Sequence, residues 1–475
     1  MTVGAAARHG RNLAALLAGE AVQKIIALLL FMALSRWLTI EENGRYGLFT
    51  AVFPLMVVFL NMGFYDVAVR DIAQHPDRAG ALVGGAWRAQ GLLFVGVFAL
   101  CLGAVFTGAG GGEKWLMPAA LAVAALFAAG RMNLAVMAAR ERFDAVSLWT
   151  VALRAGAAAA AAALAFSNAP VWLIVAGLAP VHLCWWLAGA AWNTRRSGVV
   201  PARPEPGGIA RLFREGVPMA AGGFAATLYF AMDLPLYRFF ADETAAGQYA
   251  IGVRFMMLLF PLADAAGAVM YPLLSRRSLD PGGGESAPLA RCHLAMLCLA
   301  APMAAGAALT ARPLTLFIAG DKYLPGAFAL AGLTASFALF LPALAAITHL
   351  RARGRQRTVM VVVAGACLAK AALVSALAGP WQDRGMVLAN LLAGLLMAGM
   401  LLFFSLRLAA PGTAGWVGRN ALRGLAAAAA MAVVLWPLRD WPAPATVPLG
   451  AVVFLAAGWL AGLRSLLRGD AEEAS

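Results

Sequence analysis

Long apolar stretches, each followed by a short polar turn, make up most of the chain. Each stretch is about 18–25 residues long, which as an α-helix crosses the roughly 30 Å hydrocarbon core of a bilayer. Segments such as 92–106 and 359–368 lack the apolar–polar alternation of barrel strands. Because a segment in lipid must satisfy its own backbone hydrogen bonds, the pattern predicts transmembrane α-helices.

The pattern predicts an all-α polytopic membrane protein with about fourteen transmembrane helices. We place the helices at residues 12–35, 47–69, 83–107, 115–138, 147–166, 171–192, 215–239, 247–273, 288–310, 325–348, 358–379, 386–406, 419–437 and 445–463. The longest connection between them, 193–214, is rich in proline and contains the pair Gly207-Gly208. This composition is typical of a linker between two parts of a protein.

The composition agrees with the membrane interpretation, since 62% of the residues are hydrophobic and only 13% are charged. Soluble domains carry about 25% charged residues. The net charge of +14 would suit a nucleic-acid partner, but the basic residues are scattered over many short loops. Alternate loops carry most of the arginines. The charges therefore predict a membrane topology with both termini in the cytoplasm, and no nucleic-acid binding.

A short motif occurs twice along the chain. Residues 42–46 open the second predicted span and residues 245–249 open the eighth. A shift of 203 residues (247 minus 44) superposes Gly44 on Gly247 and Tyr46 on Tyr249. We therefore expect two six-helix lobes in a parallel pseudo-twofold repeat. The lobes are residues 12–192 and 215–406, with a cytoplasmic linker at 193–214 and two additional transmembrane helices at 419–463.

Ionisable residues inside the predicted spans are the candidate functional groups, because a charge in hydrocarbon is costly and usually faces a protein interior or a water-filled cavity. Basic groups suit an anionic substrate, since Lys and Arg bind phosphates well. We predict as substrate-binding residues Lys24, Arg254, Arg88, Arg154 and Lys370. We predict as ion-coupling residues, able to bind H⁺ or Na⁺, Glu20, Asp264, Asp233 and Asp66.

Several of these residues also have a purely structural interpretation. Arg88 and Arg154 lie near predicted span ends, where a long side chain can reach the membrane interface. Asp66 and Asp233 also lie near span ends, where each could cap a helix or join a local pair. Lys370 lies deep in its span, and a local ion pair explains it as well as a binding role does.

Sequence patterns of known enzymes are missing from the chain. The five histidines are dispersed, and the five cysteines show no CxxC spacing. The connections between spans are too short to fold as a catalytic domain. We therefore expect no enzymatic activity, no metal site and no cofactor.

Short motifs between about residues 12 and 410 resemble those of bacterial polysaccharide flippases. In the first half they are Gly44-Arg45-Tyr46, Asn61-Met62-Gly63-Phe64 and Val69-Arg70-Asp71-Ile72-Ala73; in the second they are Gly216-Val217-Pro218, Gly247-Gln248-Tyr249 and Tyr271-Pro272-Leu273-Leu274-Ser275-Arg276. The sequence is similar to the O-antigen and exopolysaccharide repeat-unit flippases of the multidrug/oligosaccharidyl-lipid/polysaccharide transporter superfamily. Asp71 departs from the glutamate that is usual in the family at that position.

The resemblance implies a two-lobed transporter of the bacterial inner membrane that takes part in polysaccharide or lipopolysaccharide biosynthesis. It would move an undecaprenyl-diphosphate-linked oligosaccharide repeat unit by alternating access, through a cationic cavity that includes Lys24 and Arg254. The implied partners are the lipid-linked glycan and an H⁺ or Na⁺ coupling ion. We expect a monomer, and an association with the glycan polymerase machinery stays open.

Three other functions stay open at this point. A peptidoglycan-precursor flippase and a cation-coupled drug antiporter belong to the same superfamily. A membrane glycosyltransferase or glycan polymerase would need a longer loop with catalytic side chains than this chain offers.

Overall fold

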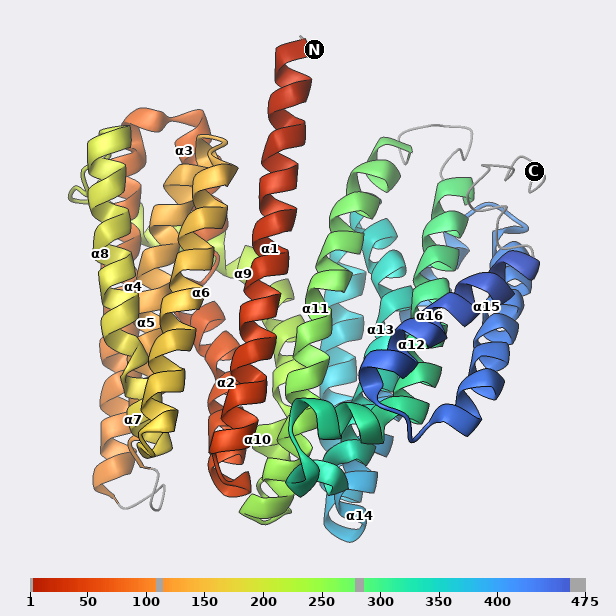
Figure 1. Cartoon of the computed structure of the whole chain (residues 1–475). Helices are drawn as coiled ribbons and strands as arrows, with labels where there is room; N and C mark the ends of the chain where they lie inside the picture. The colour runs from red at the N-terminus through yellow and green to blue at the C-terminus, as the bar shows by residue number, and fades with distance from the viewer. Residues whose placement is uncertain (1–2, 108–113, 278–285, 462–475) are drawn as a thin grey trace. The chain divides into compact units, whose positions relative to one another are not determined.

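The structure is a computed structural model that describes residues 3–107, 114–277 and 286–461 (Figure 1). Within these ranges, the side chains of residues 3–17, 222, 264, 268, 272, 276 and 277 are not part of the description. The chain divides into two compact units, which we call unit 1 (Met1–Ala231) and unit 2 (Met232–Ser475). Each unit is described by itself.

All regular secondary structure in the described residues of unit 1 is helical. Its helices are α1 (Val3–Trp37), α2 (Ile40–Asn61), α3 (Phe64–Gln74), α4 (Ala79–Phe106), α5 (Leu116–Ala139), α6 (Phe143–Phe166), α7 (Val171–Ala176), α8 (Leu178–Ser197) and α9 (Gly208–Ala231), with the 3-10 turn η1 (Pro76–Arg78) before α4. The central helix is α5, which is rich in buried alanine and packs against α2, α3, α4, α7 and α8. Small side chains let these backbones approach closely.

All regular secondary structure in the described residues of unit 2 is helical as well. Its helices are α10 (Asp233–Tyr237), α11 (Glu243–Arg277), α12 (Ser286–Ile318), α13 (Ala327–Ala352), α14 (Gln356–Arg407), α15 (Thr413–Leu435) and α16 (Ala443–Leu460), with the 3-10 turns η3 (Asp321–Gly326) and η4 (Trp436–Leu438). The central helix is α13, which packs against α11, α12 and α14. The last two helices, α15 and α16, pack on each other and on α12.

Twelve helices of the described chain have the length and apolar character needed to cross a membrane. The longest of them, α14, joins two helices across a kink at Gln382, so it accounts for two predicted spans. The span predicted at 215–239 corresponds to α9 and α10 and is not among the twelve, because charged residues such as Arg211 and Glu215 occupy the first turns of α9. Each of the fourteen predicted spans therefore lies in helical structure, which is one helix, half of one, or two short helices in succession. The prediction of an all-α polytopic protein is confirmed.

The span predicted at 47–69 is wrong in its detail, because the structure divides this stretch. Met62 (φ 41°) and Gly63 (φ 76°) adopt left-handed backbone conformations, which end α2 and start α3. At its other end, α2 begins two turns earlier than predicted because Thr39 and Glu42 form a capping box: Glu42 N donates to Thr39 Oγ1 at 3.2 Å, and Thr39 N donates to Glu42 Oε2 at 2.9 Å.

The boundary between the units does not fall in the proline-rich connection. The structure places α9 with unit 1, where it packs against α2, α3 and α4, and the boundary follows Ala231. Tight backbone contacts explain this packing. A Cβ atom added to Gly63 would lie 2.3 Å from the carbonyl oxygen of Gly216, and one added to Gly216 would lie 2.3 Å from that of Met62. Only glycine at both positions permits this approach.

Candidate functional site

A fully buried ion pair lies inside unit 2. Lys370 on α14 places its Nζ atom 2.7 Å from Oδ1 of Asp233, the first residue of α10. The exposed fractions of the two side chains are 0% and 1%, so no solvent screens the charges. The sequence assigned these residues to different roles, a substrate-binding lysine and an ion-coupling aspartate. The structure brings them together as one neutral unit.

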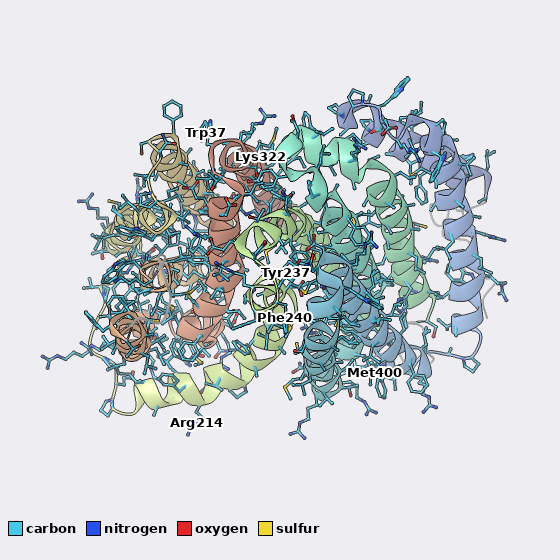
Figure 2. The ribbon with its side chains drawn as sticks, turned by 90° about the horizontal axis from the view of Figure 1, so that it is seen from below. Trp37, Arg214, Tyr237, Phe240, Lys322 and Met400 are labelled. Carbon is cyan, nitrogen blue, oxygen red and sulfur yellow. The ribbon has the colours of Figure 1, made fainter. Side chains whose placement is uncertain are left out.

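Two tyrosines extend this pair into a polar cluster. Tyr249 on α11 is fully buried, and Asn390 on α14 donates from Nδ2 to the Tyr249 hydroxyl at 3.3 Å. The ring of Tyr237 on α10 lies 5.0 Å from that of Tyr249, centroid to centroid, and the Tyr237 hydroxyl donates to Oδ1 of Asp383. The cluster thus ties α10 and α11 to both halves of α14. Figure 2 labels Tyr237 among the side chains around it.

The cluster lies beside the kink in α14. Gln382 has φ 47° and ψ −126°, a conformation outside the helical region, and Pro380 precedes it by two residues. Asp383 follows the kink directly and Asn390 lies two turns further along the second half. Pro380 removes a backbone donor and Gln382 interrupts the hydrogen-bond ladder, so side chains of the cluster hold the two halves in place.

Arg254 lies on α11, five residues after Tyr249. Only 7% of the residue is exposed, although it lies in the middle of an apolar helix. Neighbouring Gly252 packs directly on α13: an added Cβ would lie 2.8 Å from the carbonyl carbon of Ala329. The α11 helix thus packs closely on α13 in this region, and the Arg254 side chain is buried within unit 2.

Three candidates of unit 1 lie on α1 and α6, which pack along each other. A Cβ added to Gly19 on α1 would lie 1.8 Å from the Ser147 hydroxyl oxygen on α6, so the two helices touch next to Glu20. Arg154 on α6 interacts electrostatically with Glu20 and with Tyr46, and no ion pair within 4.0 Å holds it among the described residues. Lys24, one turn after Glu20, is half-buried. Glu20, Lys24 and Arg154 are thus neighbours on one pair of helices.

Two predicted residues do not join these groups in the structure. Arg88 on α4 and Asp66 on α3 are exposed on unit 1. The side chain of Asp264, on α11, lies outside the described part of the chain. Arg131, a basic residue in a predicted span, lies with its guanidinium carbon 4.5 Å from the centre of the Tyr65 ring, which is a cation–π contact.

Sequence reasoning missed a closed ring of four charges at the start of α9. Arg211 donates from Nη2 to Asp71 Oδ2 at 2.7 Å and from Nε to Glu215 Oε1 at 2.8 Å. Arg70 donates from Nε to Asp71 Oδ1 at 2.8 Å and from Nη2 to Glu215 Oε2. These contacts hold the pKa of Glu215 well below its usual range, with Arg211 the larger cause and Arg70 the next. The adjacent Arg70-Asp71 was the visible signal in the sequence.

The ring and the nearby glycine contact explain two of the short motifs along the chain. The segment from Val69 to Ala73 supplies Arg70 and Asp71, and the segment from Asn61 to Phe64 supplies the glycine on which Gly216 packs. Both motifs therefore serve one junction, where α3 meets α9 within unit 1. Asp71 is 4% exposed and its carboxylate pairs with both arginines. Aspartate, although one methylene shorter than the glutamate usual in the family, therefore completes the ring.

A family model described as "Polysaccharide biosynthesis protein" matches residues 9–278, which is more than half of the chain. The chain belongs to this family. None of the curated proteins matches the sequence. This family assignment confirms the polysaccharide resemblance seen in the short motifs.

Solved structures share the fold over nearly the whole chain. A structure titled "Lipid II flippase MurJ, inward closed conformation" covers 96% of this chain and 99% of its own, with a TM-score of 0.76 and 13% identity. An inward-facing multidrug resistance MATE family transporter of the MOP superfamily covers 82% and 98%, with a TM-score of 0.59 and 14% identity. A mutant of the Vibrio cholerae MATE transporter VcmN covers 85% and 96%, with a TM-score of 0.58 and 13% identity. At these identities the likeness shows a shared polytopic membrane fold.

Proposed function

We propose that the protein is a flippase, not an enzyme, that moves an undecaprenyl-diphosphate-linked oligosaccharide repeat unit across the bacterial inner membrane by alternating access. The observation that carries this proposal is the buried Arg254 within an apolar helix of a chain from a polysaccharide biosynthesis family. A guanidinium within an apolar helix is costly and usually marks a functional position. The diphosphate of a lipid-linked glycan fits such a residue, because Arg binds phosphate oxygens in a bidentate manner.

The structural neighbour named a lipid II flippase supports the same class of cargo. Its title names a flippase for a lipid substrate, and its fold covers nearly all of this chain. The family is described as a polysaccharide biosynthesis protein, which supports a glycan-bearing cargo. In this proposal both termini face the cytoplasm, and the protein acts as a monomer that hands its cargo to glycan polymerase machinery.

The ion pair changes the roles that we assign. Lys24, Arg254, Arg88 and Arg154 are the proposed substrate-binding residues. Lys370 is held by Asp233 at 2.7 Å and fully buried, so we assign it to positioning α10 against α14. Its charge is already balanced and cannot attract a second anion strongly.

We assign coupling to H⁺ or Na⁺ first to Glu20, Asp66 and Asp264. Glu20 and Asp66 are exposed and form no ion pair within 4.0 Å among the described residues, and Asp264 lies on α11 beyond Arg254. Asp233 would have to release Lys370 to bind an ion. We therefore rank it behind the other three.

The structural neighbours also bear on two alternative functions. A peptidoglycan-precursor flippase would also bind a diphosphate, and the fold of the lipid II flippase favours it as the second candidate. A cation-coupled drug antiporter has the related MATE fold but would require acidic groups where this chain has Arg254 and Lys24.

Proteoliposome flipping assays with defined lipid-linked substrates test the proposal. We expect transport of an undecaprenyl-diphosphate oligosaccharide, with Arg254→Ala reducing the rate at least tenfold and Arg254→Lys retaining part of it. Arg140→Ala, which removes an arginine from the loop between α5 and α6, is the matched control and should transport normally. Transport of a lipid-linked peptidoglycan precursor alone would favour the second candidate, and full activity of Arg254→Ala would contradict the cationic-site assignment.

A further inference from the structure

A cavity of about 270 Å³ lies in unit 1, apart from the residues that we assign to transport. We call it the linker pocket. Residues 198–207 of the proline-rich connection and the start of α9 form one wall. The end of α3 and the start of α4 form the other. Figure 2 labels Arg214 on α9, one of its lining residues.

Glycines on α4 fix the wall made by the connection. Ala202 N donates to the carbonyl oxygen of Gly80 at 2.9 Å. A Cβ added to Gly80 would lie 2.3 Å from the carbonyl oxygen of Val200, and one added to Gly84 would lie 2.0 Å from that of Ala202. The connection therefore lies directly on the α4 backbone, which keeps the pocket in one shape.

The charges that line the pocket are mostly basic. Arg78, Arg211 and Arg214 outnumber Asp71 and Glu205, which leaves a net charge of +1 (three minus two) with His75 taken as neutral. Asp71 is already satisfied by two arginines. Glu205 lies 3.6 Å from Arg78 Nε, and both side chains are about half exposed. The two carboxylates are therefore paired, and positive charge remains.

Several of the pocket's donors have no partner in the part of the chain that the structure describes. The side chains of Arg214 and His75 are exposed and make no hydrogen bond or ion pair there. Arg211 uses only Nε and one N–H of Nη2, so the remaining guanidinium donors stay available. These side chains, from α3 and α9, converge on one cavity.

The first turn of α9, next to the pocket, also has backbone donors that are unpaired among the described residues. Gly207 (φ 75°) and Gly208 line the pocket and have no side chain that could cap the helix. Gly208 N donates to Glu205 O and Arg211 N to Gly207 O, which leaves the N–H groups of Ile209 and Ala210 without a described acceptor. Such groups bind the oxygens of an anion.

The floor of the pocket is apolar and lies beside the start of a candidate membrane-spanning segment. Val67 and Leu212 are buried in it, and Leu82 is half-buried. The candidate membrane-spanning segment begins at Pro76, next to His75, and includes Arg78 in its first turn. A ligand with a phosphate and a short apolar part would contact both the basic rim and the floor.

We propose that the linker pocket binds a phosphoryl group through Arg78, Arg211 and Arg214, with the headgroup of an anionic phospholipid as the favoured source. A soluble phosphate ester offers the same chemistry. A phosphoryl group bound here would bridge α4, the connection and α9. This site is separate from the transport site, so its test does not depend on the flippase proposal.

Lipid retention tests the first source. The full-length protein is reconstituted with phosphatidylglycerol or with phosphatidylcholine, and retained lipid is counted by native mass spectrometry. We expect phosphatidylglycerol to be retained, and Arg214→Gln to weaken retention about tenfold because one charge-assisted contact is lost. Arg214 has no contact to break, so this variant should fold normally. Arg203→Gln removes the same charge from the connection without touching the pocket and is the matched control.

Calorimetry with glycerol 3-phosphate and with inorganic phosphate tests the soluble source. Saturable binding of either that Arg214→Gln weakens and Arg203→Gln does not would support the site with a soluble ligand. The proposal is overturned if none of the three probes binds. It is also overturned if Arg203→Gln weakens binding as much as Arg214→Gln, because that result would show a general charge effect.

Discussion

Lys370 Nζ lies 2.7 Å from Asp233 Oδ1, with both side chains closed off from solvent. Removing one member leaves the other charge buried without a partner, which costs about 3–5 kcal/mol. We therefore expect Lys370→Met to lower the unfolding free energy by about that amount, as measured by denaturation in detergent. The double variant Asp233→Asn/Lys370→Met removes both charges and should recover most of the loss.

An exposed pair provides the control for this experiment. Arg142 Nε lies 3.1 Å from Asp144 Oδ1, with more than half of each side chain exposed. Arg142→Met should cost at most about 1 kcal/mol, because water screens the charges and hydrates the partner that remains. Equal losses at the two sites would contradict the assignment of Lys370 to a buried structural pair.

Gly63→Ala should destabilise unit 1 through two separate effects. Gly63 has φ 76°, which costs a residue with a side chain about 1–2 kcal/mol. The added Cβ would also lie 2.3 Å from the Gly216 carbonyl oxygen, and relieving that overlap costs about 1–3 kcal/mol more. Gly198→Ala measures the backbone effect alone, because Gly198 has φ 66° and no atom lies within 4 Å of its added Cβ. A loss at Gly63 no larger than that at Gly198 would show that α9 can move away without cost.

The charge ring predicts a dependence of stability on pH. Arg211 and Arg70 lower the pKa of Glu215 from 4.5 to about 2, so the ring stabilises the protein fully above about pH 4.5 and loses that contribution as the pH falls toward 2. The thermal midpoint of the wild type should fall on acidification through this range more steeply than that of Glu215→Gln. Glu205→Gln, at a looser pair, should keep the wild-type slope. Parallel curves for the wild type and Glu215→Gln would contradict this prediction.

Gln382→Gly should stabilise the protein, against the usual effect of glycine in a helix. Its φ of 47° and ψ of −126° strain a residue with a side chain by about 1–3 kcal/mol, whereas the added freedom of glycine costs about 0.5–1 kcal/mol. Arg384→Gly, two residues further along at an exposed helical position, should lose about 1 kcal/mol. Unfolding in detergent measures both, and a loss of stability in Gln382→Gly would show that the kink is unstrained.

The helices were predictable because each apolar run is long enough to cross a membrane, and the cost of an unsatisfied backbone in lipid leaves few alternatives. The break between α2 and α3 was not, because Met62-Gly63 lies inside an apolar run and its left-handed turn depends on the contact with Gly216. A hydropathy pattern records how apolar a residue is, and it does not record which backbone a distant glycine touches.

The candidate site was predictable as a set of residues but not as a set of pairs. Asp233 and Lys370 are conspicuous as charges in apolar surroundings, yet their pairing depends on how α10 packs against α14. Tyr237 and Asn390 carried no signal, since single polar side chains of this kind are common in helices. The arginines of the 193–214 connection were interpreted only as topology, whereas Arg211 also completes the ring with Asp71.

The close fit of the connection on Gly80 and Gly84 has a practical consequence for dividing the polypeptide. Its proline-rich sequence suggests a natural place to cut, but its backbone is bonded to α4 and should resist limited proteolysis of the native protein. A cut there would also separate α9 from α2, α3 and α4, against which it packs. Two polypeptides intended to fold independently and be expressed side by side should instead be divided after Ala231, where unit 1 ends.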